Sequence, residues 1–167
     1  MALDKNIIIN VAKNIAPNVD VIEHHGDLTL VVGRDVVTDV LAELKENPAT
    51  DFNQCVDITA IDWARKTDRF EVVYILYSIP NKTHVRVKTA VREDKPHLPT
   101  VTDLWEGANW YEREAYDMYG IIFDGHPDLR RFYMPEDFMD ADGEPLYPLR
   151  KDFPLAGIPG SLPLPQK

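Results

Sequence analysis

The residues that could carry chemistry gather in the final third of this 167-residue chain. The run ERExYD at 112–117 combines carboxylates with a guanidinium, which are groups used in metal sites, acid–base chemistry and ion pairs. Two further charged motifs follow it, GHPDLRR at 125–131 and PLRKDFPL at 148–155. Glycine and proline punctuate both motifs, a pattern that solvent exposure alone would not require. Together the three motifs predict a surface that docks on other proteins through contacts between arginine and carboxylate.

Helical geometry argues against a metal site at the first motif. Glu112 and Glu114 lie about 200° apart around a helix of 3.6 residues per turn, so they cannot bind one ion together. Arg113 and Asp117 are four residues apart and face each other, but an exposed pair of this kind contributes only about 0.2–0.5 kcal/mol. So small an energy does not explain so dense a set of charges, which favours contacts across a dry interface. We therefore predict no metal site in the chain.

The paired arginines Arg130 and Arg131 could hold a phosphate group or the carboxylates of a neighbouring protein. No glycine-rich loop such as GxGxxG or GxxxxGK occurs, so a nucleotide would lack its cradle. His126 is interpreted as a loop histidine fixed by hydrogen bonds. Ser78 lacks a GxSxG context and Cys55 has no basic neighbour in sequence, which disfavours an independent hydrolase. We expect no catalytic and no cofactor-binding residue in this chain.

Composition narrows the class of protein further. The net charge of -10 and the pI near 4.9 disfavour nucleic-acid binding, which depends on lysine and arginine contacts to phosphates. The single cysteine, Cys55, cannot supply the four thiolates of an iron–sulfur cluster, and we interpret it as an inert buried thiol. No apolar run approaches the ~18 residues of a membrane span, so membrane contact should be indirect. The N-terminus lacks the pattern of a signal or transit peptide, which favours a cytoplasmic protein.

The elements that must position the motifs follow from the spacing of apolar residues and from turn signals. In the first 93 residues these predict helix 4–16, strands 19–22 and 28–32, helix 34–47, and strands 55–63, 70–79 and 83–91. A further helix over 104–118 would carry the first motif. It should end at Gly120, where a glycine cap is favourable.

This order of elements predicts an α+β fold, with an antiparallel or mixed sheet of about five strands and helices on one face. We expect residues 1–93 to form an α/β domain, and residues 94–126 to form a linker followed by the motif helix. Within this second part, the composition of 94–99 predicts the linker. Residues 127–167 hold eight of the 13 prolines and should form an extended docking tail with little regular structure.

The three motifs, in this order and near these spacings, resemble the C subunit of the proton-pumping NADH-quinone oxidoreductase, respiratory complex I, which belongs to the 30 kDa subunit family. The resemblance covers roughly residues 105–158. The chain departs from it in small ways, because the aromatic pair Phe132-Tyr133 stands where aliphatic residues are usual, and Tyr119 stands where phenylalanine is common. These changes keep the apolar character of the positions, so the resemblance stands.

The resemblance implies a non-catalytic structural subunit in the hydrophilic arm of the complex. It would dock on the D subunit, which holds the quinone site, with the B and I subunits nearby, and support electron transfer to quinone coupled to proton translocation. Iron–sulfur clusters, FMN and quinone would lie in partner subunits, and the chain would sit peripherally on the cytoplasmic side of the cell inner membrane. The residues implied to contact partners are Glu112, Arg113, Glu114, Asp117, His126, Asp128, Arg130, Arg131, Arg150, Lys151 and Asp152.

Two alternatives remain open from the sequence. The chain could be the equivalent subunit of a related complex that takes electrons from ferredoxin, from F420H2 or through a hydrogenase-linked module. It could instead be a stand-alone acidic binding module, or a small enzyme, whose tail folds on its own domain. The self-sufficient pattern of residues 1–93 motivates this second alternative.

Overall fold

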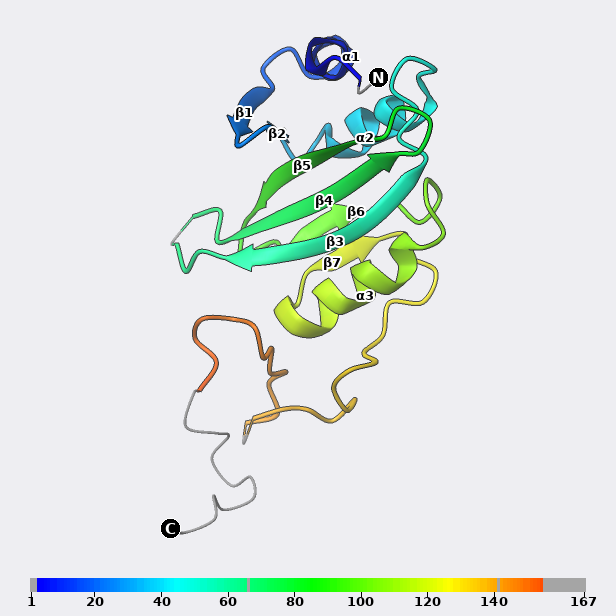
Figure 1. The fold of residues 1–167 in the computed structure, drawn as a ribbon. Coiled ribbons are helices and arrows are strands. Elements are labelled where there is room, and N and C mark those ends of the chain that lie inside the picture. Colours follow the sequence, from blue (N-terminus) through cyan, green and yellow to red (C-terminus); the bar gives the residue numbers. More distant parts are fainter. Residues whose placement is uncertain (1–2, 66, 141, 155–167) are drawn as a thin grey trace, which may run out of the picture.

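A five-stranded mixed sheet lies at the centre of the structure, a computed structural model that describes residues 3–65, 67–140 and 142–154 (Figure 1). The strand order is β1-β2-β5-β4-β3, and every neighbouring pair is antiparallel except β2 and β5, which are parallel. The strands are β1 (Asp20–His24), β2 (Asp27–Val31), β3 (Gln54–Asp62), β4 (Phe70–Ser78) and β5 (Thr83–Val91). The predicted mixed sheet is confirmed.

Burial of this sheet is one-sided, as the alternation of side chains along its strands predicts. Tyr74 and Val87 pair across β4 and β5 and are fully buried. Ile75 and Arg86 pair beside them, point to the other face and are only partly buried. One face of the sheet is therefore covered, and the other meets solvent over much of its area.

Helices α1 (Lys5–Ile15) and α2 (Val37–Glu46) pack against each other, and their buried side chains belong to the same hydrophobic core as the covered face of the sheet. The side chain of Asp4 caps α1 by accepting the backbone N–H of Asn6. The amino group of Lys45, at the end of α2, donates to the carbonyl of Leu104, so α2 meets the segment that leads into the third helix. Both helices were predicted from the sequence, and both are confirmed.

Helix α3 (Ala108–Tyr119) carries the first motif and packs along β3 (Figure 1). Side-chain contacts place it on the covered face of the sheet. The ring of its Tyr119 meets the ring of Phe70, which belongs to that face, with centroids 6.4 Å apart. The predicted start at residue 104 is wrong by one turn, because Trp105 is drawn into the core and the chain becomes helical only after Gly107. The predicted end is confirmed, since Gly120 caps the helix in the left-handed conformation with φ 76°.

A second, two-stranded sheet was not predicted. Strands β6 (His97–Pro99) and β7 (Ile122–Asp124) pair in parallel, and β6 lies inside the stretch predicted as a linker. The proline content misled the prediction, because a proline without an N–H still has a carbonyl that accepts a hydrogen bond. The N–H of Ile122 donates to the carbonyl of Pro96 at 2.7 Å. This small sheet positions both ends of α3.

The chain after β7 contains no helix or strand within its described residues, 127–140 and 142–154, and only an isolated bridge pairs Met139 with Pro145. We call residues 127–154 the strap. The prediction of little regular structure is confirmed for the strap, and the rest of the predicted tail, 155–167, lies outside the described residues. The strap lies against its own chain beneath α3, as the contacts below establish (Figure 1).

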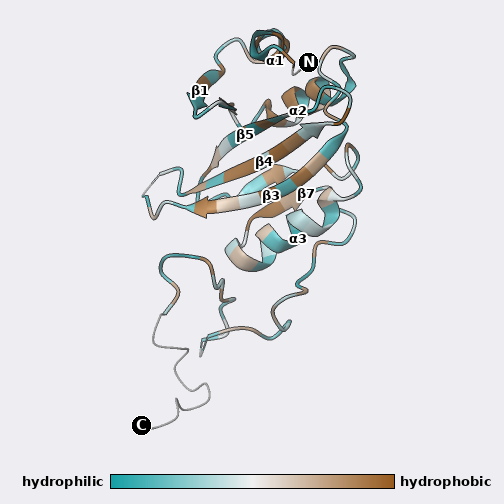
Figure 2. Ribbon diagram, in the orientation of Figure 1, coloured by the Kyte–Doolittle hydropathy of each residue, from teal (hydrophilic) through white to brown (hydrophobic). Residues whose placement is uncertain are grey.

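Apolar residues concentrate in the strands of the central sheet, whereas the strap is largely polar along its length (Figure 2). No helix of the described residues is long and apolar enough to cross a membrane. Leu129 is the only described hydrophobic residue of the strap that packs against the hydrophobic core, so other contacts must hold most of the strap. The division of the chain at residues 93 and 126 stays a prediction.

Candidate functional site

The carboxylate of Asp117 is the first of several buried groups that hold the strap. Asp117 is fully buried on α3, and its Oδ2 accepts the backbone N–H groups of Phe132, Tyr133 and Met134 at 3.1, 2.8 and 2.9 Å. Its Oδ1 lies 3.4 Å from Nη1 of Arg131. Three consecutive backbone N–H groups that lie outside any β-sheet thus find their hydrogen-bond acceptor in one carboxylate. Asp117 ties the strap to α3.

Arg113 holds the same part of the strap through its carbonyl groups. The Nε of Arg113 donates to the carbonyl of Arg130 at 3.1 Å, and Nη2 donates to that of Arg131 at 3.4 Å. Its guanidinium lies 5.0 Å from the ring centroids of both Trp110 and Phe132. The ion pair that helical spacing allows between Arg113 and Asp117 does not form among the described residues. Both groups serve the strap instead, because its unpaired backbone groups would otherwise be buried without partners.

Arg131 connects two passes of the strap. Both of its terminal nitrogens donate to the carbonyl of Leu146 at 3.1 Å, and its guanidinium stacks on the ring of Tyr147 with 5.3 Å to the centroid. Its ion pair with Asp117 links this contact to α3. The GHPDLRR motif therefore joins the start of the strap to a segment 15 residues further along.

Arg150, in the third motif, closes the end of α3. Its Nε donates to the carbonyl of Tyr119 at 2.7 Å, and its guanidinium stacks on the rings of Tyr147 and Phe70, at 4.3 and 5.1 Å. Gly120 makes this close approach possible. A Cβ at Gly120 would lie 2.6 Å from the Tyr147 ring and 2.7 Å from the Arg150 guanidinium.

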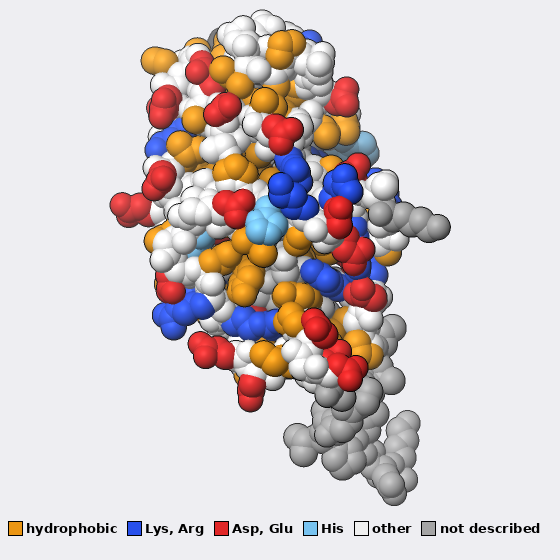
Figure 3. All heavy atoms as spheres, turned by 180° about the vertical axis from the view of Figure 1, so that it is seen from behind, with side chains coloured by type: hydrophobic (Ala, Val, Ile, Leu, Met, Phe, Trp, Pro, Cys, Tyr) orange, Lys and Arg blue, Asp and Glu red, His pale blue; other side chains and the backbone are white. Residues whose placement is uncertain are grey.

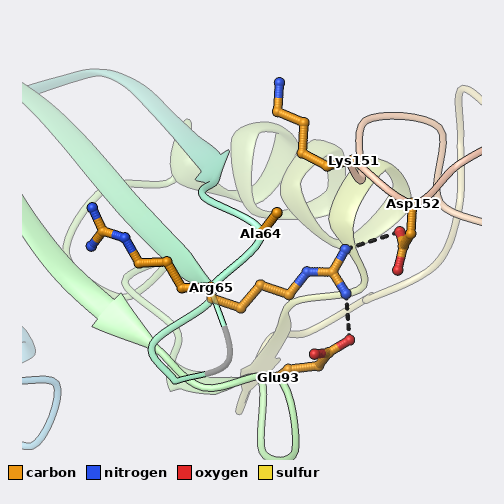
Figure 4. Close-up of a pocket in the computed structure, with 6 residues that line it drawn as sticks. Ala64, Arg65, Glu93, Lys151 and Asp152 are labelled. Carbon is orange, nitrogen blue, oxygen red and sulfur yellow. Dashed lines mark hydrogen bonds and ion pairs between the residues drawn. The ribbon is translucent and has the colours of Figure 1, made fainter.

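The end of the strap meets a buried ion pair between Asp62 of β3 and Arg69. Figure 4 shows two further contacts of the same guanidinium, to Glu93 and Asp152. Arg69 binds Asp62 with two hydrogen bonds of 3.1 and 2.8 Å, and also pairs with Glu93 and, at 2.9 Å, with Asp152. The backbone N–H of Lys151 donates to Oδ2 of Asp62 at 2.8 Å. Burial alone would raise the pKa of Asp62, but the hydrogen bonds from Arg69 and Lys151 outweigh it and lower the pKa to about 2.

A shallow pocket of about 360 Å³ opens beside this ion pair. In Figure 4 the side chains of Arg65 and Lys151 point away from the ion pairs that Arg69 makes. The cationic groups of Arg65 and Lys151 thus lie at the surface, whereas that of Arg69 is used inside the chain. The pocket is the place where the strap ends against the sheet.

Glu112 lies on the inner side of α3 and is fully buried. Its two oxygens accept the N–H of Val101 at 2.7 Å and the hydroxyl of Thr100 at 2.5 Å. Burial raises the pKa of Glu112 to about 7, although these two hydrogen bonds act in the opposite direction. Glu112 therefore fixes the turn after β6, and it changes charge near neutral pH.

His126 packs against Glu112, with its Nε2 4.0 Å from Oε2 and both side chains without solvent exposure. Its Nδ1 accepts the backbone N–H of Asp128 at 3.0 Å, which leaves Nε2 protonated to donate to the carbonyl of Asn109 at 3.1 Å. The interpretation of His126 as a loop histidine fixed by hydrogen bonds is confirmed. It holds the start of the strap against the N-terminal half of α3.

The predicted partner-contact residues divide into two groups. Glu112, Arg113 and Asp117 are buried in the chain itself, the side chain of His126 is buried, and Arg131 and Arg150 are mostly covered. These six make their contacts within the chain, Glu112 to the turn after β6 and the others to the strap or to α3. Solvent reaches the other five members of the set, which are Glu114, Asp128, Arg130, Lys151 and Asp152, and their contact with a partner stays a prediction. Figure 3 shows basic, acidic and apolar side chains mixed over the half of the molecule nearest the C-terminal end.

Sequence reasoning missed Asp62 and Arg69. The available signal was that Asp62 falls on the buried side of an alternating strand, where an ionised carboxylate needs a partner. Its partner Lys151 lies 89 residues away in the chain, which no local pattern reveals.

Neither metal binding nor thiol chemistry is supported by the described residues. No three His, Cys, Asp or Glu side chains among them are grouped so that they could hold a metal ion. Burial raises the pKa of the Cys55 thiol to about 12, so the reactive thiolate is scarce at neutral pH.

Comparison with known proteins places the chain in a family. The family described as respiratory-chain NADH dehydrogenase, 30 Kd subunit, matches residues 30–159, which include all three charged motifs. The chain belongs to this 30 kDa subunit family. The resemblance to complex I that the motifs carry is thereby confirmed.

Relatives and solved structures agree with this membership. The chain is 42% identical over 159 residues to the C subunit of NADH-quinone oxidoreductase from Geobacter sulfurreducens, covering 94% of this chain and 93% of that protein. The trypsin-resistant fragment of Nqo5 has a TM-score of 0.67 and 36% identity, covering 75% of this chain and 98% of the fragment.

A chain in the structure of an archaeal respiratory membrane complex, the membrane-bound sulfane sulfur reductase, has a TM-score of 0.72 and 30% identity. It covers 90% of this chain and 86% of that one. As a member of the 30 kDa family, the chain is a subunit of an oxidoreductase complex, and its partners are other subunits of that complex.

Proposed function

We propose that this chain is a non-catalytic structural subunit of the hydrophilic arm of a complex I-type NADH-quinone oxidoreductase. It docks on the D subunit, which holds the quinone site, with the cluster-bearing B and I subunits nearby. By holding these neighbours in a fixed geometry it supports electron transfer to quinone coupled to proton translocation. The chain acts from the cytoplasmic side of the cell inner membrane and contacts the membrane only through the complex.

One observation carries this proposal, namely that the buried charges of the three motifs fix the strap. Asp117, Arg113 and Arg150 bind strap or helix backbone, so the exposed charges of Arg130 and Lys151 are presented from an ordered segment. A surface that is ordered before binding loses less conformational entropy when a partner arrives. The motifs therefore suit a docking surface that is formed in advance.

The redox groups belong, in this proposal, to the partner subunits. Four thiolates are the usual ligands of an iron–sulfur cluster, and this chain has one cysteine, whose thiol is held protonated. The role left to the chain is placement, to which electron transfer and quinone chemistry are sensitive.

Two observations favour alternatives. The similarity to a chain of the sulfane sulfur reductase complex fits the equivalent subunit of a related complex with another donor, such as ferredoxin, F420H2 or a hydrogenase-linked module. The contacts of the strap with its own chain fit a stand-alone acidic module, which was expected to fold its tail on its own domain. Family membership favours the subunit over the stand-alone module.

Affinity purification of the tagged chain from its native membranes in mild detergent, followed by mass spectrometry, tests the proposal. Recovery of a quinone-site subunit, iron–sulfur subunits and antiporter-like membrane subunits would support it, and NADH-module proteins among them would identify the donor. Recovery of the chain alone, from the soluble fraction, would contradict it and favour the stand-alone module.

A further inference from the structure

An aromatic patch is exposed where the strap crosses the outer side of α3. Trp110 is 57% exposed and Tyr133 is 60% exposed, more than any other described large apolar side chain. Phe132 joins them, with its ring centroid 5.7 Å from that of Trp110 and 4.1 Å from that of Tyr133. We call Trp110, Phe132 and Tyr133 the aromatic patch. Three clustered rings at the surface are more than the scattered apolar side chains that soluble proteins normally expose.

The aromatic patch is held rigidly although it is exposed. Asp117 binds the backbone N–H groups of Phe132 and Tyr133, and the guanidinium of Arg113 stacks beneath Trp110 and Phe132. Rigid tryptophan and tyrosine side chains contribute large contact area at low entropic cost, and they are enriched among the residues that dominate binding energy. The geometry is therefore that of an anchor for another protein.

A strongly acidic loop lies next to the aromatic patch. Between Arg131 and Arg150 the chain has no lysine or arginine, and no described cation lies within ion-pair distance of the acidic side chains in this stretch. Asp140 orders the loop by accepting the N–H groups of residues 142 and 144, both at 2.9 Å. The acidic residues are Glu136, Asp137, Asp140, Asp142 and Glu144.

From this arrangement we propose that the aromatic patch and the acidic loop bind a lysine- and arginine-rich surface of another subunit of the complex. The proposal rests on the function proposed above and adds a second contact surface to it. Cations of the partner stack on Trp110 and Tyr133 and pair with the neighbouring carboxylates. A second copy of this chain fits poorly, since its net charge is -10.

The test uses cells in which a tagged copy of the chain replaces the native one. Tyr133 is replaced by the photo-reactive amino acid p-benzoyl-phenylalanine, the complex is isolated and irradiated, and the cross-linked peptides are sequenced. We expect cross-links to a peptide of another subunit that contains lysine or arginine. We also expect Glu136→Gln with Asp137→Asn to lower the cross-link yield at least threefold and to weaken its dependence on salt.

A matched control removes the same charge elsewhere. Asp35→Asn with Asp39→Asn, on the exposed surface at the start of α2, should leave the cross-link yield unchanged. A different outcome is that the chain still co-purifies with the complex but cross-links to a peptide that lacks lysine and arginine, to a second copy of itself, or to nothing. Each of these results would overturn this inference and leave the proposed function standing. A chain that fails to co-purify with other subunits at all would overturn both.

Discussion

The central sheet and the strap hold their backbone in opposite ways. In the sheet, β4 pairs with β3 and β5 along its length, and apolar side chains such as Tyr74 and Val87 supply the buried area. In the strap, the backbone groups of 130–134 and 146 bind charged side chains, chiefly Asp117, Arg113 and Arg131. The described part of the strap forms no β-strand, and its backbone is ordered instead by hydrogen bonds to charged side chains.

This difference changes how the charged motifs are understood. Six of the residues implied to bind partners instead make buried contacts within the chain, although the motif pattern suggested that all of them would be exposed. A buried charge with several hydrogen bonds is costly to disturb, whereas an exposed charge contributes little to stability. Substitutions within one motif should therefore differ greatly in their effects, according to which side of the strap each residue faces.

The largest effect on stability should come from Asp117→Ala, because it leaves three strap amides and Arg131 without their partner. We expect a loss of about 3–5 kcal/mol in the free energy of unfolding. Protease cleavage within 132–147 should become rapid while the sheet stays folded. Urea unfolding and limited proteolysis measure the two effects, with Glu114→Ala on the same helix as a control that changes stability by about 0.5 kcal/mol or less.

Glu112 should make stability depend on pH in the opposite direction to Asp62. Because its pKa is raised to about 7 in the folded chain, the fold binds a proton that the unfolded chain releases near pH 4.5. This contribution to stability is present below pH 4.5 and is lost as the pH rises to about 7, at roughly 1.4 kcal/mol per pH unit. Asp62, with its pKa lowered to about 2, contributes stability above pH 3.8 that is lost as the pH falls towards 2.

Glu112→Gln should remove the first of these dependences. We expect the variant to be more stable than the wild type by about 2–3 kcal/mol at pH 8 and similar to it at pH 4.5. Urea denaturation at a series of pH values gives the comparison. An unchanged slope between pH 5 and 7 would show that Glu112 does not titrate in the folded chain near neutrality.

Gly120→Ala should separate the strap from the end of α3. The added Cβ would be strained at the left-handed φ and would clash with Tyr147 and Arg150. We therefore expect the free energy of unfolding to fall by about 2 kcal/mol or more. Gly143→Ala is a matched control, because its φ of 84° is similar but nothing lies within 4 Å of the added Cβ. The control should cost about 1 kcal/mol. Equal losses for the two variants would mean that the close packing at Gly120 adds nothing.

The smallest effect on stability, and a distinct effect on assembly, should follow from Lys151→Ala. Its side chain is exposed and only its backbone N–H binds Asp62, so the free energy of unfolding should change by about 0.5 kcal/mol or less. Recovery with other subunits should nevertheless fall in affinity purification. Full recovery of the complex at all salt concentrations would remove Lys151 from the contact surface.

The parts of the fold that the sequence predicted are those with strong local signals. The alternation of Val85, Val87, Thr89 and Val91 predicted β5, and Gly120 predicted the end of α3. The small parallel sheet was missed because its strands have three residues each, and because β6 follows Pro96 and ends at Pro99. Strands this short carry no period that can be counted.

The site was predicted in its residues but only partly in their roles. The motifs correctly marked where charge is dense, and His126 was correctly interpreted as a loop anchor. Helical spacing allowed an ion pair between Arg113 and Asp117 that does not form, because such spacing reports which side chains can meet and not which other groups compete for them. The strap competes successfully, through backbone groups that no side-chain pattern displays.

Hydrogen exchange of the backbone amides of Phe132, Tyr133 and Met134 in the purified full-length chain tests the central claim most directly. If buried motif charges hold the strap on its own chain without a partner, these three amides should exchange about 100-fold or more slowly than in an unfolded peptide. They should lose that protection in Asp117→Ala. Exchange at the unfolded rate in the wild-type chain would contradict the account, and would mean that the partner rather than Asp117 orders the strap.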